Sequence, residues 1–418
     1  MSSEWTFAPL EQCLDALIDY RGKTPEKTSS GIPLITAKII KNGRIEKPTE
    51  FIAIDNYDSW MRRGIPLEGD VVLTVEAPLG EAAQLGADKI ALAQRVVTLR
   101  GKKGLLDNTY LLYLLQTEEM LDQLKARATG TTVLGIKQSE LRKVRLSLPP
   151  IKQQIAAARI LKSLDDRITL LRETNSTLEA IAQALFKSWF VDFDPVRHKA
   201  EGRQPEGMDA ATAALFPDSF EESELGLVPK GWAIGELQDL LVLQRGFDLP
   251  ASERIEGEYP LIAASGPNGT HHIAMAKGPG VVTGRSGVLG KVFLSLEDYW
   301  PLNTTLWVKE FKRATPCYAF ELLKLLDFAS FNAGSAVPTL NRNHVHSLKY
   351  VLPPQETVGA YEGAALLINQ RVLENNRQAQ TLTKLRDTLL PRLISGQLRL
   401  PEAEALVAGD ARACADAY

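Results

Sequence analysis

The sequence repeats itself, and this internal duplication constrains the fold more than any other feature. Residues 130–150 (GTTVLGIKQSELRKVRLSLPP) align without a gap with residues 334–354 (GSAVPTLNRNHVHSLKYVLPP), at an offset of 204. Upstream the copies match more loosely, for example residues 32–35 with residues 259–262 at an offset of 227. A unit that occurs twice predicts two domains of one fold. Because the offset of 204 continues beyond each copy, the order along the chain is domain, helix, domain, helix.

Each copy has the pattern of an α+β domain. Short β-branched runs bounded by Gly, Pro or Asp predict strands at residues 71–75, 95–99 and 281–283. The first and the last of these runs align with each other at an offset of 210. Apolar periodicity predicts a helix near 108–127 and a counterpart near 317–328.

A heptad pattern follows each domain, with apolar residues spaced alternately three and four apart. The first seam consists of Leu161, Leu164, Ile168, Leu171, Asn175, Leu178, Ala182, Leu185 and Trp189, and the second of Ala365, Ile368, Val372, Asn375, Ala379, Leu382, Arg386, Leu389 and Leu393. The first helix is bounded by Pro149-Pro150 and by Asp194-Pro195. Its forty residues would extend about 60 Å.

Two such seams in one chain are most simply buried against each other. Since each helix follows its own domain, we expect an antiparallel pair with a domain at each end and pseudo-twofold symmetry. The polar Asn175 and Asn375 would set the register of the pair at some cost in stability. The alternative, in which each helix only covers its own domain, is disfavoured by the length of the helices.

Composition excludes several classes of protein. Hydrophobic residues make up 44% and charged residues 24%, as in a soluble globular protein. No apolar run approaches the roughly 18 residues of a membrane span, and the N-terminus lacks a signal-peptide pattern. Cys13, Cys317 and Cys414 lie far apart, which disfavours a disulfide scaffold or a cysteine zinc site. We therefore expect a cytoplasmic protein without a membrane partner.

No catalytic or metal-binding motif can be singled out. Residues 284–291 (GRSGVLGK) have five residues between the outer glycines, where a phosphate-binding loop has four, so a turn between strands is predicted. Residues 192–195 lack most of the amino-methyltransferase motif. Residues 271–272 and 344–346 supply too few histidines for a zinc site. These observations favour a non-catalytic reader or scaffold without a metal or cofactor of its own.

The charge distribution is uneven. The net charge of −3 does not by itself favour a nucleic-acid partner. Yet residues 21–47 carry seven basic residues and two acids, and residues 125–145 carry six and one. Residues 268–291 carry three basic residues, two histidines and no acid. Such local basic segments are compatible with DNA docking, and equally with ordinary solvated surfaces.

Several segments of the sequence resemble those of a known family. Residues 148–195, from LPPIKQQ to FVDFDP, closely resemble the central helical region of type I restriction-enzyme specificity subunits. The other segments that resemble this family are 31–45, 69–85, 259–272, 281–292, 299–309, 334–354 and 382–400. The Leu-Pro-Pro–helix element makes the resemblance specific, because it occurs twice at a constant spacing. The second copy departs from the first directly after its prolines, where residues 355–357 read QET.

The resemblance implies a non-catalytic DNA-specificity subunit. Its two α/β target recognition domains would each read one half of a bipartite double-stranded DNA target, and the antiparallel helices would set the half-site spacing. Two domains on one DNA face are expected about 34 Å apart. The implied partners are two modification subunits, which supply S-adenosylmethionine and adenine methylation, and restriction subunits, which supply ATP- and Mg-dependent translocation and cleavage.

The predicted organisation has six segments. They are the first recognition domain (1–150), the central helical spacer (151–195), a connector (196–231), the second recognition domain (232–354), the distal helical spacer (355–400) and a C-terminal tail (401–418).

Candidate DNA-binding residues were chosen by chemistry, because Lys and Arg contact phosphates while Arg, Lys, Asn, Ser and Thr read base edges. The candidates are Lys23, Lys38, Lys41, Asn42 and Arg44 in the first domain, and Arg245, Ser265, Asn268, His271, Arg285 and Ser286 in the second. Each could instead be an ordinary loop residue. For the modification subunits the candidates are Lys187, Trp189, Phe190 and Phe193, with core packing as the alternative for the aromatic residues.

Two other functions remain open. The chain could be the specificity module of a different methyltransferase–nuclease architecture, or a coiled-coil adaptor without a DNA role.

Overall fold

The computed structural model describes residues 5–22, 24–328 and 339–415. The chain divides into two compact units. Unit 1 comprises Met1–Leu170 and Gln378–Tyr418, and unit 2 comprises Leu171–Arg377. Each unit therefore combines one copy of the repeat with part of each long helix.

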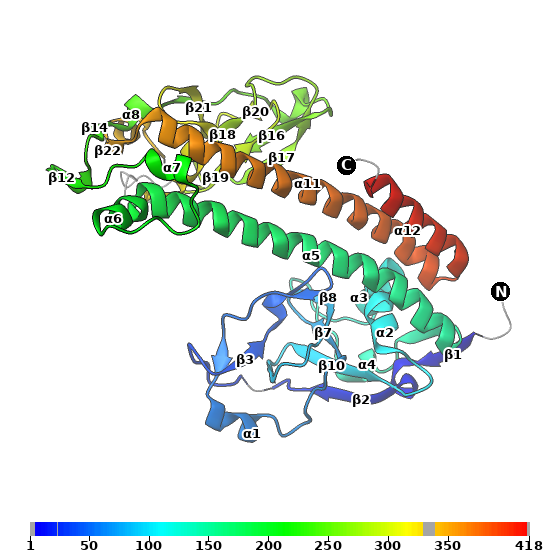
Figure 1. The fold of residues 1–418 in the computed structure, drawn as a ribbon. Helices are drawn as coiled ribbons and strands as arrows, with labels where there is room; N and C mark the ends of the chain where they lie inside the picture. Colours follow the sequence, from blue (N-terminus) through cyan, green and yellow to red (C-terminus); the bar gives the residue numbers. More distant parts are fainter. Residues whose placement is uncertain (1–4, 23, 329–338, 416–418) are drawn as a thin grey trace. The chain divides into compact units, whose positions relative to one another are not determined.

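Unit 1 is built on a four-stranded antiparallel sheet with the order β2-β10-β7-β8 (Figure 1). All five residues of β7 are buried, so this strand lies at the centre of the unit. The strands of unit 1 are β1 (Thr6–Pro9), β2 (Leu14–Asp19), β3 (Ile32–Ile35), β4 (Ile40–Lys41), β5 (Arg44–Ile45), β6 (Phe51–Ile52), β7 (Val71–Val75), β8 (Leu79–Gln84), β9 (Ala91–Leu92), β10 (Val96–Gly101) and β11 (Arg145–Leu148). A second sheet has the order β6-β3-β9, and β1 pairs with β11.

Unit 2 repeats the four-stranded sheet, the three-stranded sheet and the terminal strand pair of unit 1, whereas the β4–β5 pair of unit 1 and the β12–β13 pair of unit 2 lie at different places in the strand order. Its main sheet has the order β15-β21-β18-β19, its three-stranded sheet the order β17-β16-β20, and β14 pairs with β22. The strands are β12 (Phe220–Ser223), β13 (Gly226–Pro229), β14 (Ala233–Glu236), β15 (Leu241–Arg245), β16 (Tyr259–Ala263), β17 (Gly266–His271), β18 (Gly280–Gly284), β19 (Val292–Ser295), β20 (Trp300–Pro301), β21 (Thr305–Phe311) and β22 (Lys349–Leu352). A parallel pairing of strands recurs as well, as β3 with β9 and as β16 with β20. The duplication seen in the sequence is thus a duplication of the fold.

Two helices have forty residues each, and the other described helices have sixteen or fewer. The helices are α1 (Tyr57–Trp60), α2 (Asn108–Leu115), α3 (Glu118–Ala126), α4 (Gln138–Leu141), α5 (Ile151–Phe190), α6 (Asp194–Ala200), α7 (Ala210–Ala214), α8 (Leu237–Leu240), α9 (Pro316–Leu325), α10 (Arg342–His346), α11 (Gln355–Ile394) and α12 (Leu400–Ala415). Short 3-10 helices are η1 (Leu10–Cys13), η2 (Ala37–Ile39), η3 (Ile54–Asn56) and η4 (Ala251–Glu253). In the described ranges no helix has both the length and the apolarity that crossing a membrane requires.

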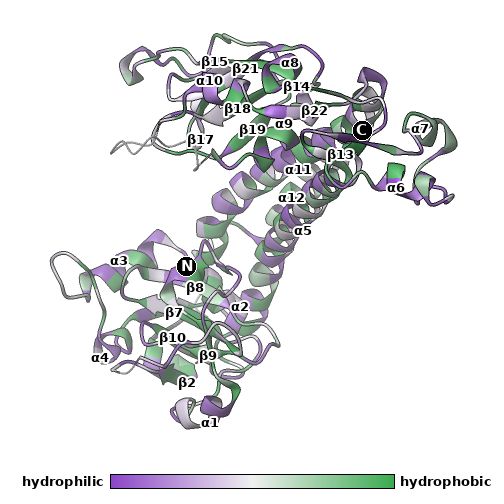
Figure 2. Ribbon diagram, turned by 90° about the vertical axis from the view of Figure 1, so that its left-hand side faces the viewer, coloured by the Kyte–Doolittle hydropathy of each residue, from purple (hydrophilic) through white to green (hydrophobic). Residues whose placement is uncertain are grey.

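The two forty-residue helices pack against each other as an antiparallel pair. In unit 2, Asn375 Nδ2 lies 2.8 Å from Asn175 Oδ1, and Tyr361 Oη donates to the Ala182 carbonyl at 3.2 Å. The residue numbers of α11 fall as those of α5 rise, which defines the antiparallel direction. Polar and apolar residues alternate along both helices (Figure 2). This arrangement confirms the predicted fold class of two α+β domains with a helical pair.

Most residues of the predicted seams are buried, each within its own unit. The buried ones are Leu161, Leu164, Ile168, Ala379, Leu382, Leu389 and Leu393 in unit 1, and Leu171, Asn175, Ala182, Trp189, Ala365, Val372 and Asn375 in unit 2. Leu178, Leu185 and Ile368 are half-buried. Leu185 packs against the aromatic core of unit 2.

The structure differs from the sequence prediction in three places. The single helix expected near 108–127 is divided into α2 and α3, because Thr117 Oγ1 accepts a hydrogen bond from the Met120 amide and caps a new helix. The connector contains α6, α7 and the β12–β13 hairpin, and it buries Val196 and Phe216 in the core of unit 2. The expected C-terminal tail begins as helix α12.

Candidate nucleic-acid interface

In unit 2 the candidate residues gather where β18 ends and β21 begins. The Arg285 and Ser286 amides both donate to the Thr304 carbonyl, at 2.8 and 3.1 Å. On the other side the Arg285 carbonyl accepts from the Leu340 amide at 2.8 Å, and Ser286 forms a β-bridge with Thr339. The backbone of Arg285 and Ser286 is therefore fixed from both sides, while their side chains remain partly exposed.

The side chains around this position form a polar network drawn from three separate segments. Arg285 Nη1 donates to the Asn303 carbonyl at 3.3 Å, and Asn303 Nδ2 donates to Asp248 Oδ1. Arg245 Nη2 lies 3.4 Å from the same oxygen of Asp248. Guanidinium, amide and carboxylate groups are those that read guanine, adenine and cytosine in the major groove. The network therefore has the chemistry of a base-reading site.

The β16–β17 turn adjoins the network. Lys291 Nζ donates to the Ser265 carbonyl at 3.4 Å, and the Ala264 amide donates to Thr304 Oγ1 at 3.2 Å. Ser265 and Asn268 are both exposed. Five of the six candidates of the second domain are thus exposed or half-exposed side chains on neighbouring strand ends and turns.

His271 is the exception, and the prediction that its side chain contacts DNA is wrong because the side chain is buried. Its side chain is only 3% exposed, and its ring packs edge-on against Trp300 at 5.1 Å between centroids. Its Nδ1 accepts a hydrogen bond from the Ile255 amide at 3.1 Å. His271 therefore belongs to the core of unit 2, and the basic run in the sequence was misleading at this position.

In unit 1 the candidate residues lie on and beside the β4–β5 hairpin. Asn42 and Gly43 form its turn with positive φ angles of 51° and 82°, as the Asn-Gly sequence favours. Lys38 and Lys41 are exposed, and Lys41 Nζ pairs with Glu46 Oε2 at 2.9 Å. Lys23 lies outside the described residues.

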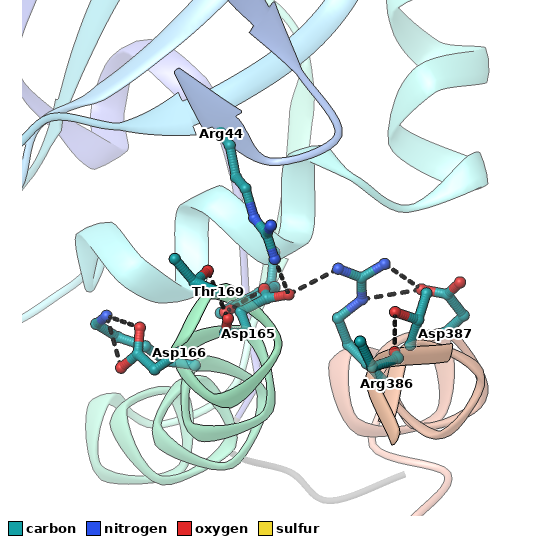
Figure 3. Close-up of polar contacts among 10 residues, drawn as sticks. Arg44, Asp165, Asp166, Thr169, Arg386 and Asp387 are labelled. Carbon is teal, nitrogen blue, oxygen red and sulfur yellow. Dashed lines mark hydrogen bonds and ion pairs between the residues drawn. The ribbon is translucent and has the colours of Figure 1, made fainter. Parts of the chain in front are cut away.

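Arg44 points from this hairpin toward helix α5, as Figure 3 shows. Its Nη2 lies 4.0 Å from Asp165 Oδ1, which also accepts from Arg386 Nη1 of α11 at 2.6 Å. Asp165 Oδ2 accepts from Tyr113 Oη at 2.8 Å. Burial, and then the Asp165 carboxylate, raise the pKa of the Tyr113 hydroxyl, which therefore stays a donor. Arg44 thus contributes to the attachment of the domain to helix α5, whose Asp165 also pairs with Arg386 of α11.

Arg44 and Asp165 also line a hollow of about 680 Å³ between the domain and helix α5. Its other walls include Lys47, Gln84 and Lys162. In the part of the chain that the structure describes, no three His, Cys, Asp or Glu side chains are grouped as a metal ion would require.

The aromatic candidates for a partner interface are buried, so the prediction that these side chains contact a partner is wrong. Phe190 packs edge-on against Tyr318 with ring centroids 4.9 Å apart, and Trp189 packs against Phe216 at 5.2 Å. Phe193 packs against Trp232 at 5.7 Å. These rings complete the core of unit 2, as the core-packing alternative anticipated.

The fourth partner-interface candidate remains at the surface. Lys187 is exposed, and its Nζ lies 2.9 Å from Asp192 Oδ2. This hydrogen bond, together with the charge of Asp192, raises the pKa of Lys187. The side chain is therefore a fully charged group on the exposed face of α5.

The known proteins that this chain is similar to share one description. The model of the type I restriction modification DNA specificity domain matches residues 3–180. The type I restriction enzyme MjaIX specificity subunit of Methanocaldococcus jannaschii is 24% identical over 362 residues, which cover 80% of this chain and 79% of that protein. The HindI specificity subunit of Haemophilus influenzae is 25% identical over 377 residues, covering 74% and 82%.

The solved structures include a similar fold. The S subunit of a type I restriction–modification system from M. genitalium aligns with a TM-score of 0.62 and 18% identity, covering 94% of this chain and 97% of that one. Residues 3–180 are therefore similar to the type I restriction modification DNA specificity domain, and the similarity to one specificity subunit extends over four fifths of the chain. The resemblance predicted from the sequence is confirmed.

Sequence reasoning missed the strand ends of unit 1 that correspond to the network of unit 2. They carry Asp19, Arg21, Glu76 and Arg95. A signal was present in the sequence, since the offset of 210 aligns Glu76 with Ser286.

Proposed function

We propose that this chain is the non-catalytic DNA-specificity subunit of a type I restriction–modification enzyme, in which each unit's domain reads one half of a bipartite target. The observation that carries the proposal is the repetition of the four-stranded sheet, the three-stranded sheet and the terminal strand pair in the two units, together with the polar network at the strand ends of unit 2. A duplicated fold supplies two equivalent reading surfaces, and two surfaces suit a target of two half-sites.

The helices α5 and α11 would set the spacing between the half-sites. A pair of forty-residue helices gives a rigid element of defined length. The hydrogen-bonded Asn175 and Asn375 fix its register, because any shift would leave both buried amides opposite apolar residues.

The helices would also dock the two modification subunits. In unit 2 the side chains of Ile181 on α5 and Leu367 on α11 are 50% and 69% exposed, and Leu170 of unit 1 is exposed as well. Apolar side chains that remain exposed on a packed helical pair suit a partner surface. In this proposal they replace the buried aromatic residues, and Lys187 remains a candidate at the rim.

Catalysis would come entirely from the partners. The modification subunits would supply S-adenosylmethionine and adenine methylation, and the restriction subunits ATP- and Mg-dependent translocation and cleavage. The specificity chain would supply the choice of sequence and the distance between the methylated positions.

The experiment that tests the proposal is reconstitution of the chain with its modification subunits, followed by binding to a pool of random DNA duplexes. Enrichment of one bipartite sequence is the expected result. A complex that assembles but enriches no sequence would favour the coiled-coil adaptor, and failure to assemble with type I modification subunits would favour a different methyltransferase–nuclease architecture.

A further inference from the structure

We propose that the first recognition domain reads its half-site with Arg21, Glu76, Arg95 and Lys137 at its strand ends, and not with the β4–β5 hairpin. This inference rests on the proposed function and adds the residues that determine specificity in unit 1. It follows from the register of the two main sheets, from side-chain contacts, and from a hollow that these four residues line or border.

The strand end of β7 in unit 1 is held by three contacts. The Val75 amide donates to the Arg95 carbonyl at 3.0 Å, and the Ile136 amide donates to the Val75 carbonyl at 3.0 Å. Glu76, the next residue, forms a β-bridge with Gly135. The backbone at Glu76 is therefore fixed between the start of β10 and the segment that precedes α4.

Unit 2 has the same three contacts at the end of β18. Arg285 donates to Thr304 and accepts from Leu340, both at 2.8 Å, and Ser286 bridges Thr339. Contact for contact, Glu76 therefore occupies the place of Ser286, and Arg95 the place of Thr304. Ser286 follows Arg285 and Thr304 follows Asn303 in the chain, so both positions lie next to residues of the polar network in unit 2.

The sheet register extends the match to the neighbouring strand. Asp19 pairs with Val97 at the end of β2, and Arg245 pairs with Leu306 at the end of β15. Since Val97 and Leu306 are equivalent positions of β10 and β21, Asp19 occupies the place of Arg245. One backbone site thus carries an acid in one unit and a guanidinium in the other, as expected for domains that read different half-sites.

The side chains of unit 1 converge at these strand ends. Arg21 Nε donates to Asp19 Oδ2 at 2.9 Å, and Arg21 Nη1 donates to the Ile136 carbonyl at 2.6 Å. Arg95 Nε lies 3.6 Å from Glu76 Oε1, and these two side chains are 50% and 42% exposed. Exposed groups that already meet one another lose little conformational entropy when they bind a base edge.

A hollow of about 230 Å³ lies among these residues. Its walls include Arg21, Glu76, Thr129, Val133 and Lys137. Val133 and the adjacent Leu134 are exposed apolar side chains on the loop beside it. The set has the four chemistries of major-groove recognition: guanidinium for guanine, carboxylate for the cytosine amino group, an ammonium group for phosphate or guanine, and apolar groups for the thymine methyl.

The β4–β5 hairpin is a poorer candidate for DNA contact because its Arg44 guanidinium already faces a carboxylate of helix α5. Arg44 faces Asp165 on helix α5, and the Asn42 amide donates to Glu81 Oε2 at 2.8 Å. Reading DNA with Arg44 would require this attachment to be broken.

The test is a base-resolution map of adenine methylation in host cells that carry the full set of subunits. Glu76→Gln and Arg95→Gln change the proposed site, and Arg245→Gln changes the equivalent place in unit 2. Lys41→Ala, at the hairpin, is the matched control. We expect Glu76→Gln and Arg95→Gln to relax base preference about 10-fold at one or two positions of one half-site. Arg245→Gln should relax the other half-site, and Lys41→Ala should leave the motif unchanged.

Other outcomes would overturn the inference. An unchanged motif with both unit 1 variants, relaxation of both halves by either one, or relaxation by Lys41→Ala would each do so. Loss of all methylation by variants with wild-type thermal unfolding would assign these residues to anchoring instead of base reading. Failure of the proposed function is seen separately, because deletion of the whole gene would then leave every methylated motif in place.

Discussion

Asn375 Nδ2 donates to Asn175 Oδ1 at 2.8 Å, between two helices whose facing surfaces are otherwise mainly apolar. Asn175 Nδ2 in turn reaches the Val372 carbonyl at 3.3 Å and Asn376 Oδ1 at 2.9 Å. In this register both Nδ2 groups and Asn175 Oδ1 are hydrogen-bonded, while Asn375 Oδ1 is buried without a partner among the described residues. Under the proposed function, in which the helices set the spacing between the half-sites, a fixed register has a direct functional value.

Replacing one member of this pair should cost stability. Asn375→Leu leaves the Asn175 carbonyl oxygen without its donor in a buried position, for an expected loss of about 1–3 kcal/mol in the free energy of unfolding. The double variant Asn175→Leu/Asn375→Leu should recover most of this loss, because no buried amide remains. Urea unfolding of the three proteins measures it. A single variant as stable as the wild type would contradict the register role.

The Asp165 carboxylate should contribute to stability far more than its neighbour Asp166. Asp165→Asn removes the partner of Arg386 and weakens the contact with Arg44, and we expect a loss of about 2 kcal/mol in unfolding free energy. Asp166→Asn is the matched control, because Asp166 is 63% exposed and pairs only along its own helix with Lys162. Its loss should stay below about 0.5 kcal/mol. Equal effects of the two substitutions would refute the attachment role of Asp165.

Arg285 should determine one base of the target. Arg285→Ala is expected to reduce discrimination at a single position by about 1–3 kcal/mol, measured as dissociation constants for duplexes with single-base changes. Lys309→Ala, an exposed cation on β21, is the control and should leave the preferences unchanged. If Arg285→Ala weakened binding to every duplex equally, a phosphate contact would be indicated instead.

Exposed residues of the helical pair should be required for assembly and not for folding. Ile181→Glu places a charge on the proposed docking surface, and Lys187→Glu reverses one at its rim. Both variants should fail to co-purify with the modification subunits while their circular dichroism spectra stay unchanged. Co-purification at the wild-type level would show that the partner binds elsewhere, and loss of helical signal would show that the residue serves the fold.

Glu321 should make unit 2 less stable as the pH rises. Burial raises the pKa of this carboxyl, against the lowering effect of Lys324, so the folded state holds its proton at a higher pH than the unfolded chain does. Stability is therefore greatest below the ordinary pKa of Glu and declines between that value and the raised one. Glu321→Gln should increase the melting temperature more at pH 8 than at pH 4, whereas the exposed Glu310→Gln should not. A gain independent of pH would contradict the assignment.

The periodicity of apolar residues accounts for the helices and strands that could be predicted from the sequence. Both forty-residue helices follow from heptad spacing, the first of them between proline boundaries, and strand β7 follows from a run of β-branched residues. The break at Thr117 was missed because a cap depends on one local hydrogen bond that apolar spacing does not reveal.

The candidate site was harder to predict because it is assembled from distant segments. Selecting basic runs led to Arg44, whose guanidinium faces Asp165, and to His271, whose ring is buried. Glu76 was overlooked because a single acid in an apolar stretch resembles a solvated turn. The β-bridges of the two residues agree with the sequence offset of 210 that aligns Glu76 with Ser286 of the other unit.

The most direct test of the central claim is a base-resolution map of adenine methylation in host DNA, with and without this gene. The proposed function predicts that one bipartite motif loses its methylation on deletion and regains it when the gene is restored. Persistence of every methylated motif, in cells that still express active modification subunits, would contradict it.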